Sequence, residues 1–177
     1  MKGHFLKAMT GTVYSGYLHS SRGRPLFILD NLRSAFNVGS VFRSADAASP
    51  FAVFLTGICC RPGNRKLART SRGTHRIVPW RYFLHAPDAV SWAIDSGREI
   101  VAVENVSGAQ PLWQADFPLS SAFILGNEAM GIDPDLRKMA HRSVYLPQTG
   151  ERTCINVSSM GAVIAAEILR RRLLDSL

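Results

Sequence analysis

The sequence contains few cysteines and no long apolar run. Its three cysteines, Cys59, Cys60 and Cys154, have neither the paired spacing of a zinc site nor the even number of a disulfide framework, and the five histidines are scattered. We therefore expect no bound metal. No apolar stretch approaches the roughly 20 residues that span a bilayer, and residues 1–10 lack the apolar block of a secretory signal. These absences predict a cytoplasmic protein that does not bind membranes.

Two common nucleotide-binding motifs are also missing. The first apolar run is not followed by Gly-x-Gly-x-x-Gly, and the chain has no P-loop Gly-Lys-Ser/Thr. The sequence therefore disfavours a conventional dinucleotide or nucleoside triphosphate site.

Acidic residues are outnumbered, with 13 Asp and Glu against 21 Lys and Arg, which gives a formal net charge of +8. This balance favours a polyanionic partner, because each Lys or Arg that meets a phosphate releases condensed counterions. The 177 residues, 46% of them hydrophobic, suffice for one globular domain with a full core. We assign residues 1–24 to a basic N-terminal extension, which either reaches a phosphate backbone or is a solvated tail. The folded domain is assigned to residues 25–177.

Apolar runs alternate with helical patterns from residue 25 onward. Four runs are typical of strands buried on both faces: residues 26–29, 51–55, 100–103 and 122–125. A fifth strand is predicted at residues 144–146 and a weak one at 77–78, and helical patterns cover 39–48, 87–96, 134–140 and a segment after residue 156. The alternation predicts an α/β domain with a mostly parallel sheet and helices on both faces. Ligands of such domains bind at the carboxyl ends of the strands.

Three polar motifs follow the carboxyl ends of predicted strands. They are Asn-x-Gly-x-x-x-Arg at Asn37, Gly39 and Arg43; Gly-Asn-Glu-x-x-Gly at Gly126, Asn127, Glu128 and Gly131; and Pro-x-x-Gly at Pro147 and Gly150, followed by Asn156, Val157 and Ser158. In this order the motifs resemble the SpoU, or TrmH-like, branch of the SPOUT RNA methyltransferases. The resemblance runs from about residue 25 to residue 172.

The resemblance implies transfer of a methyl group from S-adenosylmethionine to a ribose 2′-hydroxyl of RNA. It favours tRNA as the substrate, with rRNA as the second choice, and it implies a homodimer. It also implies that the C-terminal segment forms a deep trefoil knot, which no periodicity in the sequence indicates. By the same resemblance the cofactor pocket is formed by Val103, Leu125, Gly126, Asn127, Leu146, Gly150, Cys154 and Ile155.

The resemblance assigns catalysis to Asn37, Arg43, Glu128 and Asn156. We expect Glu128 to pair with Asn37 or Arg43, and we expect Arg43 to reach back beside Asn37. Because an arginine guanidinium keeps its proton in proteins, Arg43 is better suited to hold a phosphate or a developing alkoxide than to abstract a proton. Each residue has a simpler alternative: Asn156 caps a helix, Glu128 is a surface acid and Arg43 is a surface arginine.

The sequence departs from the family at Cys154, where a serine is usual, and at Gln148, where methionine is common. Cys154 could be a conservative replacement, or it could be the nucleophile of a base-methylating enzyme, although no neighbouring histidine indicates an activated thiolate. A third alternative is an RNA-binding protein that keeps the fold and has lost catalysis.

The densest basic cluster lies between the second and third strong strand patterns. We assign its residues Arg61, Arg65, Lys66, Arg69 and Arg72 to RNA binding. Trp80, Arg81 and Tyr82 follow, and basic residues interleaved with aromatic ones suit phosphate binding and base stacking. The alternative is a solvated run of charge.

Overall fold

The computed structural model describes residues 24–48, 51–151 and 154–176. The predicted N-terminal extension, apart from Arg24, lies outside the described residues. The elements in chain order are β1 (Leu26–Leu29), α3 (Ala35–Ala47), β2 (Ala52–Thr56), α4 (Arg65–Ser71), the 3-10 helix η1 (Thr74–Arg76), β3 (Trp80–Phe83), α5 (Ala86–Asp95), β4 (Ile100–Val103), β5 (Gln110–Pro111), β6 (Ala122–Leu125), α6 (Pro134–Lys138), β7 (Arg142–Tyr145) and α7 (Val157–Leu174).

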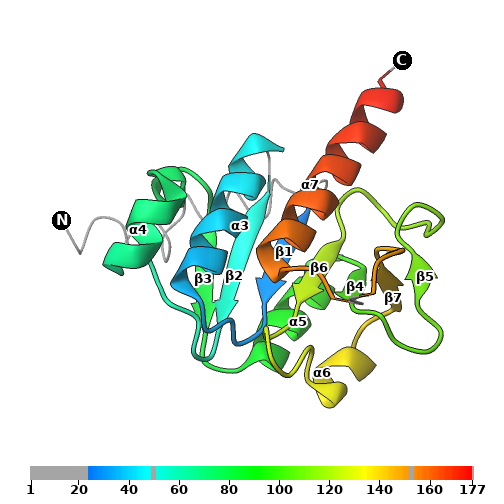
Figure 1. Ribbon diagram of the computed structural model, residues 1–177, viewed down its shortest axis with the longest axis horizontal. Helices are drawn as coiled ribbons and strands as arrows, with labels where there is room; N and C mark the ends of the chain where they lie inside the picture. The colour runs from blue at the N-terminus through cyan, green and yellow to red at the C-terminus, as the bar shows by residue number, and fades with distance from the viewer. Residues whose placement is uncertain (1–23, 49–50, 152–153, 177) are drawn as a thin grey trace.

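Seven strands form one sheet in the order β3-β2-β1-β6-β4-β7-β5 (Figure 1). Every pairing between these strands is parallel. All residues of β1, β2 and β6 are buried, because helices cover both faces of the sheet. The predicted α/β fold with a mostly parallel sheet is therefore confirmed.

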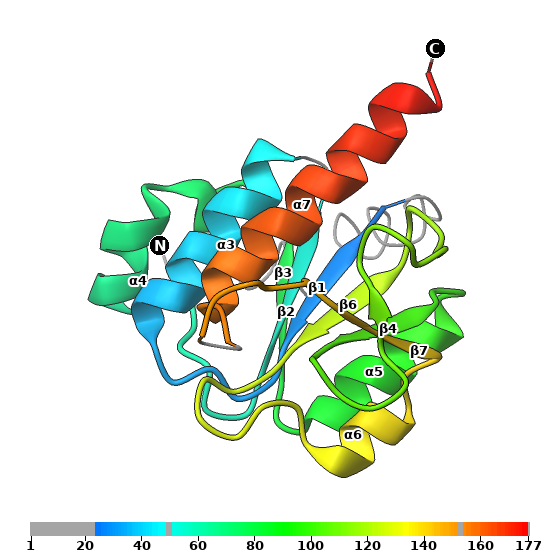
Figure 2. The same cartoon turned by 45° about the vertical axis from the view of Figure 1, so that its right-hand side comes forward.

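The two faces of the sheet form two apolar cores. Because side chains alternate along a strand, Phe27 packs beneath α3 and α7 while Ile28 packs toward α5 and α6. On the first face, Phe27 stacks on Phe51 with ring centroids 4.5 Å apart. Figures 1 and 2 show α3, α4 and α7 over one face of the sheet and α5 and α6 over the other.

Two helices differ from the sequence prediction. Helix α3 begins at Ala35, four residues before the predicted start, because Ser34 Oγ accepts a hydrogen bond from the Asn37 amide and caps it. Helix α4 was not predicted at all. Asn64 caps it, accepting hydrogen bonds from the amides of Lys66 and Leu67.

The predicted strand at residues 77–78 is wrong. The chain completes η1 there, and the edge strand β3 starts after Pro79, whose carbonyl oxygen accepts a hydrogen bond from Val53. Trp80 opens β3 opposite Val53 and is buried beneath the helices. It is therefore not available to stack on a base. The two-residue strand β5 was also missed, since it is too short to show a period.

Helix α7 returns from β7 to the face that α3 covers and lies beside α3 (Figures 1 and 2). Gly161 allows the approach, because a Cβ added there would lie 3.3 Å from Val41 Cγ2. Farther along, Arg171 of α7 pairs with the buried Glu167 and donates to the carbonyl oxygens of Leu112 and Ala115. These contacts fix the direction of α7 and hence the position of its N-terminus. The trefoil knot stays a prediction.

Candidate functional site

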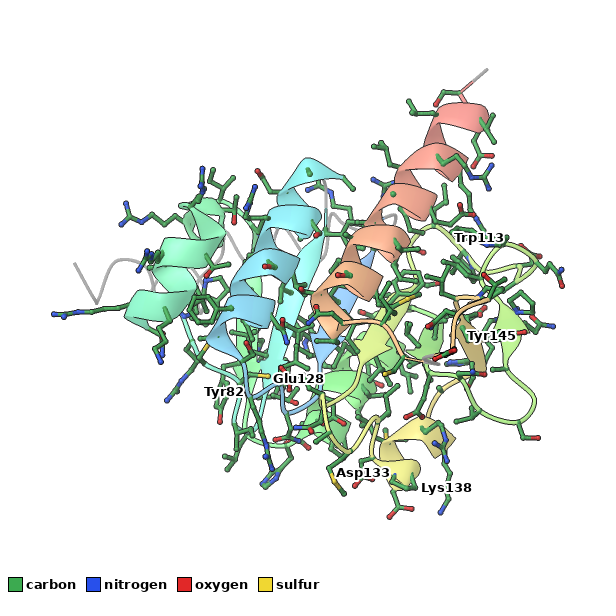
Figure 3. The ribbon with its side chains drawn as sticks, viewed as in Figure 1. Tyr82, Trp113, Glu128, Asp133, Lys138 and Tyr145 are labelled. Carbon is green, nitrogen blue, oxygen red and sulfur yellow. The ribbon has the colours of Figure 1, made fainter. Side chains whose placement is uncertain are left out.

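A cavity of about 510 Å³ opens at the carboxyl ends of β4, β6 and β7. Figure 3 labels Tyr145 on β7 and Glu128 near the start of α3, and both residues line the cavity. Seven of the eight predicted cofactor residues line it: Val103, Leu125, Gly126, Asn127, Leu146, Cys154 and Ile155. Gly150 is exposed and does not line it.

The loop after β6 forms one wall and is held tightly. Asn127 and Gly131 exchange two backbone hydrogen bonds of 2.9 Å. A Cβ added at Gly126 would lie 2.4 Å from the carbonyl carbon of Gly131, so only glycine fits at position 126. Gly131 itself has φ of 72°, in the left-handed region that favours glycine. The wall therefore brings main chain, without an intervening side chain, to the cavity at Gly126.

Glu104 directly follows β4, and the sequence interpretation gave it no catalytic or cofactor-binding role. Its Oε1 accepts a hydrogen bond from the Ile132 amide at 3.1 Å, and its Oε2 lies 2.8 Å from Arg137 Nη1. A side chain on Gly131 would collide with Glu104 Oε1. Glu104 thus ties the end of β4 to the loop after β6 and to α6. A carboxylate at the carboxyl end of a parallel strand was the available signal.

Asp30 and Asn31 were also missed. Buried Asp30 accepts hydrogen bonds from Asn31 Nδ2 at 2.8 Å and from the Asp133 amide at 3.3 Å. Burial raises the pKa of Asp30, and the two hydrogen bonds oppose that rise. Asn31 takes φ of 53° and accepts from Asn127 Nδ2 through its carbonyl oxygen at 2.7 Å. Together the two residues join the loops that follow β1 and β6.

Glu128 joins the same two loops at the cavity rim. Its Oε1 accepts from Asn37 Nδ2 at 2.9 Å and from the Ser34 amide at 3.1 Å, and its Oε2 accepts from the Arg33 amide at 3.0 Å. The predicted pairing of Glu128 with Asn37 is therefore present. Partial burial raises the pKa of Glu128, but the hydrogen bonds from Arg33, Asn37 and Ser34 outweigh it and hold the pKa below its ordinary value.

Asn156 completes this arrangement from the start of α7. Its Nδ2 donates to Asn37 Oδ1 at 3.2 Å. Its Oδ1 accepts from the amides of Ser158 and Ser159 and so caps α7. The simple capping role is thus correct, and the same side chain also contacts Asn37. Three of the four predicted catalytic residues, Asn37, Glu128 and Asn156, form one hydrogen-bonded chain.

Residues 24–166, which contain this chain of contacts, match the SpoU rRNA Methylase family. The chain belongs to this family. The resemblance noted in the three motifs is thereby confirmed.

Two curated relatives give the scale of the similarity. A Synechocystis protein named as an uncharacterized tRNA/rRNA methyltransferase is 25% identical over 145 residues, which make up 82% of this chain and 53% of that protein. The 23S rRNA (guanosine(2553)-2'-O)-methyltransferase RlmP of Bacillus subtilis is 28% identical over 143 residues, 80% of this chain and 56% of RlmP. This SpoU chain therefore spans about half the length of these relatives.

A solved structure shows the same fold. The AdoMet-bound rRNA methyltransferase from Sinorhizobium meliloti aligns with a TM-score of 0.78 and 24% sequence identity, over 87% of this chain and 60% of that one. At this identity the likeness establishes the shared architecture of the SpoU domain.

The sequence interpretation placed Arg43 beside Asn37. In the structure of this SpoU chain it does not lie there. Both residues belong to α3. Their separation of six residues corresponds to about 9 Å along the helix axis and places their side chains on different faces of the helix. Arg43 is exposed and does not line the cavity. Across the part of the chain that the structure describes, no hydrogen bond or ion pair engages its guanidinium.

The predicted RNA-binding residues lie on and around α4, on the far side of α3 from α7 (Figure 1). Arg65, Lys66 and Arg69 are exposed on the helix, and Arg72 ends it in a left-handed conformation with φ of 47°. Arg61 lies apart from the helix, with its Cζ 4.5 Å from the centroid of the Tyr82 ring. None of the five residues lines the cavity.

Within residues 24–48, 51–151 and 154–176, no helix is long and apolar enough to cross a membrane. No three His, Cys, Asp or Glu side chains in the same ranges gather into a possible metal site.

Proposed function

We propose that this SpoU chain is a cytoplasmic S-adenosylmethionine-dependent methyltransferase that modifies a ribose 2′-hydroxyl of tRNA, with rRNA as the alternative substrate. The observation that carries the proposal is the hydrogen-bonded chain Glu128–Asn37–Asn156 at the rim of the cavity. It brings together residues from three motifs that lie far apart in the sequence. The names of the two relatives, which specify tRNA/rRNA and 23S rRNA methyltransferases, support RNA as the substrate class.

The cavity fits the proposed cofactor. Its volume of about 510 Å³ lies within the range of small-molecule sites. The apolar side chains of Val103, Leu146 and Ile155 can pack against the face of an adenine ring. The exposed main chain at Gly126 allows close approach of a bulky ligand. When bound, S-adenosylmethionine supplies an electrophilic methyl group on its sulfonium.

The two asparagines are suited to hold the nucleotide. Asn37 uses one N–H of its amide on Glu128, and Asn156 uses one N–H on Asn37. Each side chain amide carries two N–H donors, so each retains one for a ribose or phosphate oxygen. Holding the attacking hydroxyl about 3–3.5 Å from the methyl carbon supplies much of the rate gain in such a transfer. Glu128 acts as a positioning residue that fixes Asn37.

Arg43 is assigned to the phosphate or to the developing alkoxide, with phosphate oxygen or water taking the proton. Its place on the outer surface of α3 means that bound RNA or a second copy of the chain must bring the reacting groups to it. A homodimer through this face is supported by the apolar surface of the adjacent α7, where Leu169, Leu173 and Leu174 are 37%, 60% and 54% exposed. Burying these side chains favours association.

A direct assay tests the proposal. Purified protein is incubated with methyl-labelled S-adenosylmethionine and with separate pools of unmodified tRNA and rRNA, and the RNA is then hydrolysed by alkali. A 2′-O-methyl group blocks cleavage of the adjacent phosphodiester, so the label is expected in alkali-resistant dinucleotides from tRNA. Label found on a base, or on neither RNA, would contradict ribose methylation.

A further inference from the structure

The carboxyl edge of the sheet continues from the cavity rim toward β3. Asn31 accepts a hydrogen bond from Asn127 on the cavity side and one from the Ile58 amide, at 3.1 Å, on the other side. Gly57 then donates from its amide to the carbonyl oxygen of Phe83 at 3.2 Å. The loops after β6, β1, β2 and β3 therefore form one unbroken surface. Figure 3 shows Glu128 and Tyr82 along this same edge.

Apolar and basic side chains share this surface outside the cavity. Ile58 is 61% exposed and Leu84 is 66% exposed, at adjoining loops. Arg61 lies over the half-buried Tyr82 ring, and the side chain of Arg33 is exposed beside Glu128. We call Arg33, Ile58, Arg61, Tyr82 and Leu84 the edge patch. It is separate from α4 and from the cavity lining.

The chain segment that carries most of the edge patch has charge of one sign only. Residues 47–87 contain seven Lys and Arg and no Asp or Glu, so this segment carries +7 of the formal net charge of +8. The segment includes four of the five edge-patch residues. Exposed apolar side chains next to this positive charge suit a partner that carries both negative charge and the flat faces of aromatic rings.

We propose that the edge patch binds the nucleotides next to the one that is methylated. Their bases pack against Ile58 and Leu84 and stack on the guanidinium of Arg61, and their phosphates lie against the positive field of residues 47–87. Tyr82 holds Arg61 flat for this contact, and donates its hydroxyl to the carbonyl oxygen of Gly57 at 2.9 Å. This inference rests on the proposed function and specifies that the flanking RNA is unpaired, because paired bases do not offer their faces.

Binding measurements on the full chain test the proposal. Fluorescence anisotropy is recorded with labelled single-stranded U12 RNA, and with the same strand annealed to A12; polyphosphate, which has charge but no bases, serves as a competitor. The test variant is Ile58→Ser with Leu84→Ser. The matched control is Ile77→Ser, because Ile77 is also in the acid-free segment, is 72% exposed and lies outside the edge patch. All three positions are exposed, so folding is preserved, and thermal melting verifies it.

The double variant is expected to bind U12 about tenfold more weakly than the wild type, as the loss of the apolar contact with a base predicts. Its affinities for polyphosphate and for the duplex should stay unchanged, and the Ile77→Ser protein should bind every probe as the wild type does. If the double variant bound U12 with wild-type affinity, the inference would be overturned. A protein would then be the candidate partner for the edge patch. An equal loss of U12 and polyphosphate binding would overturn it too, since charge alone would then explain binding.

The binding and methylation measurements distinguish failure of the edge-patch inference from failure of the proposed reaction. If the wild type transfers no methyl group to RNA but the double variant loses U12 binding selectively, the edge patch stands and the proposed reaction fails. If the wild type methylates ribose and the double variant binds U12 normally, the reaction stands and the edge patch fails.

Discussion

Asn156, the N-cap of α7, donates a hydrogen bond to Asn37 of α3 across 119 positions of sequence. The direction of this bond is fixed by Glu128, because an ionised carboxylate only accepts and must therefore face Asn37 Nδ2. Asn37 then presents Oδ1 to Asn156, which must donate from Nδ2 and keeps Oδ1 to cap α7. Each amide orientation follows from the one before it. One carboxylate thus sets the donors that two asparagines offer to a ligand.

Replacing Glu128 by glutamine tests whether this carboxylate sets the amide orientations of Asn37 and Asn156. Glu128→Gln removes the charge and one acceptor, so the amides of Arg33 and Ser34 and the side chain of Asn37 compete for a single oxygen. We expect a loss of about 1 kcal/mol in the free energy of unfolding at neutral pH, since the exposed position screens the charge. Methyl transfer should fall more than cofactor affinity. Thermal melting and a methylation assay measure the two effects.

The same variant has a predicted pH dependence. The lowered pKa of Glu128 means that its contribution to stability is complete above the ordinary value of 4.5 and is lost as the pH falls from there through the lowered pKa. The difference in melting temperature between wild type and Glu128→Gln should be constant above about pH 5.5 and should shrink toward pH 3. A difference that is independent of pH down to that point would show that the carboxylate charge is unimportant.

The sheet could be predicted from the sequence because its signals are local. The buried runs at residues 26–29 and 122–125 are strands over the same residues in the structure. Helix α4 gave no such signal, since only Leu67 and Ser71 of its seven residues are buried and no apolar period develops. Its capping residue, Asn64, was the one local indication.

The site was only partly predictable. The motifs indicated that Asn37, Glu128 and Asn156 belong together, but no spacing within one segment determines a hydrogen bond between residues of distant segments. The position of Arg43 was missed because the helix was predicted to begin at Gly39, which left Asn37 outside it. Once Ser34 is recognised as the cap, the two side chains must point to different faces.

Substitutions at two glycines test whether the rigid wall of the cavity contacts the cofactor. Gly126 is part of that wall, and Gly150 does not line the cavity. Gly126→Ala would put Cβ 2.4 Å from the Gly131 carbonyl carbon and 2.5 Å from the Ile132 nitrogen, so main chain must move. We expect cofactor affinity to fall at least tenfold and stability by roughly 2 kcal/mol. The Cβ of Gly150→Ala would meet no atom of the described residues within 4 Å, and this variant should bind as the wild type does. Calorimetry with S-adenosylmethionine compares them, and equal affinities would exclude the wall as the cofactor contact.

Arg43→Ala should abolish methyl transfer and leave cofactor affinity nearly unchanged. The reason is that Arg43 lies outside the cavity but is assigned to a substrate phosphate or alkoxide. Lys138→Ala, which removes an exposed cation outside residues 47–87, is the control and should retain activity. Single-turnover methylation and calorimetry provide the measurements. A fully active Arg43→Ala protein would remove this residue from the mechanism.

Charge reversal on α4 tests the predicted RNA contact. Arg65→Glu with Arg69→Glu should weaken binding to tRNA and lower the slope of log affinity against log salt by roughly 2, because two phosphate contacts are lost. Lys138→Glu is a suitable control, since Lys138 is exposed on α6 and pairs with Asp135. Filter binding over a range of salt concentrations gives the slopes. Identical slopes for all proteins would show that α4 does not bind RNA.

Cys154→Ser distinguishes ribose methylation from base methylation. Cys154 is exposed and lines the cavity, so its thiol could in principle attack a pyrimidine carbon. Among the residues that the structure describes, no histidine lines the cavity to activate it, and a serine hydroxyl cannot replace a thiolate in such an attack. If Cys154 only contributes to the wall, the serine variant should methylate ribose at a rate close to that of the wild type. Complete loss of methylation in Cys154→Ser, together with unchanged binding of S-adenosylmethionine, would establish the thiol as nucleophile and move the modified atom from ribose to base.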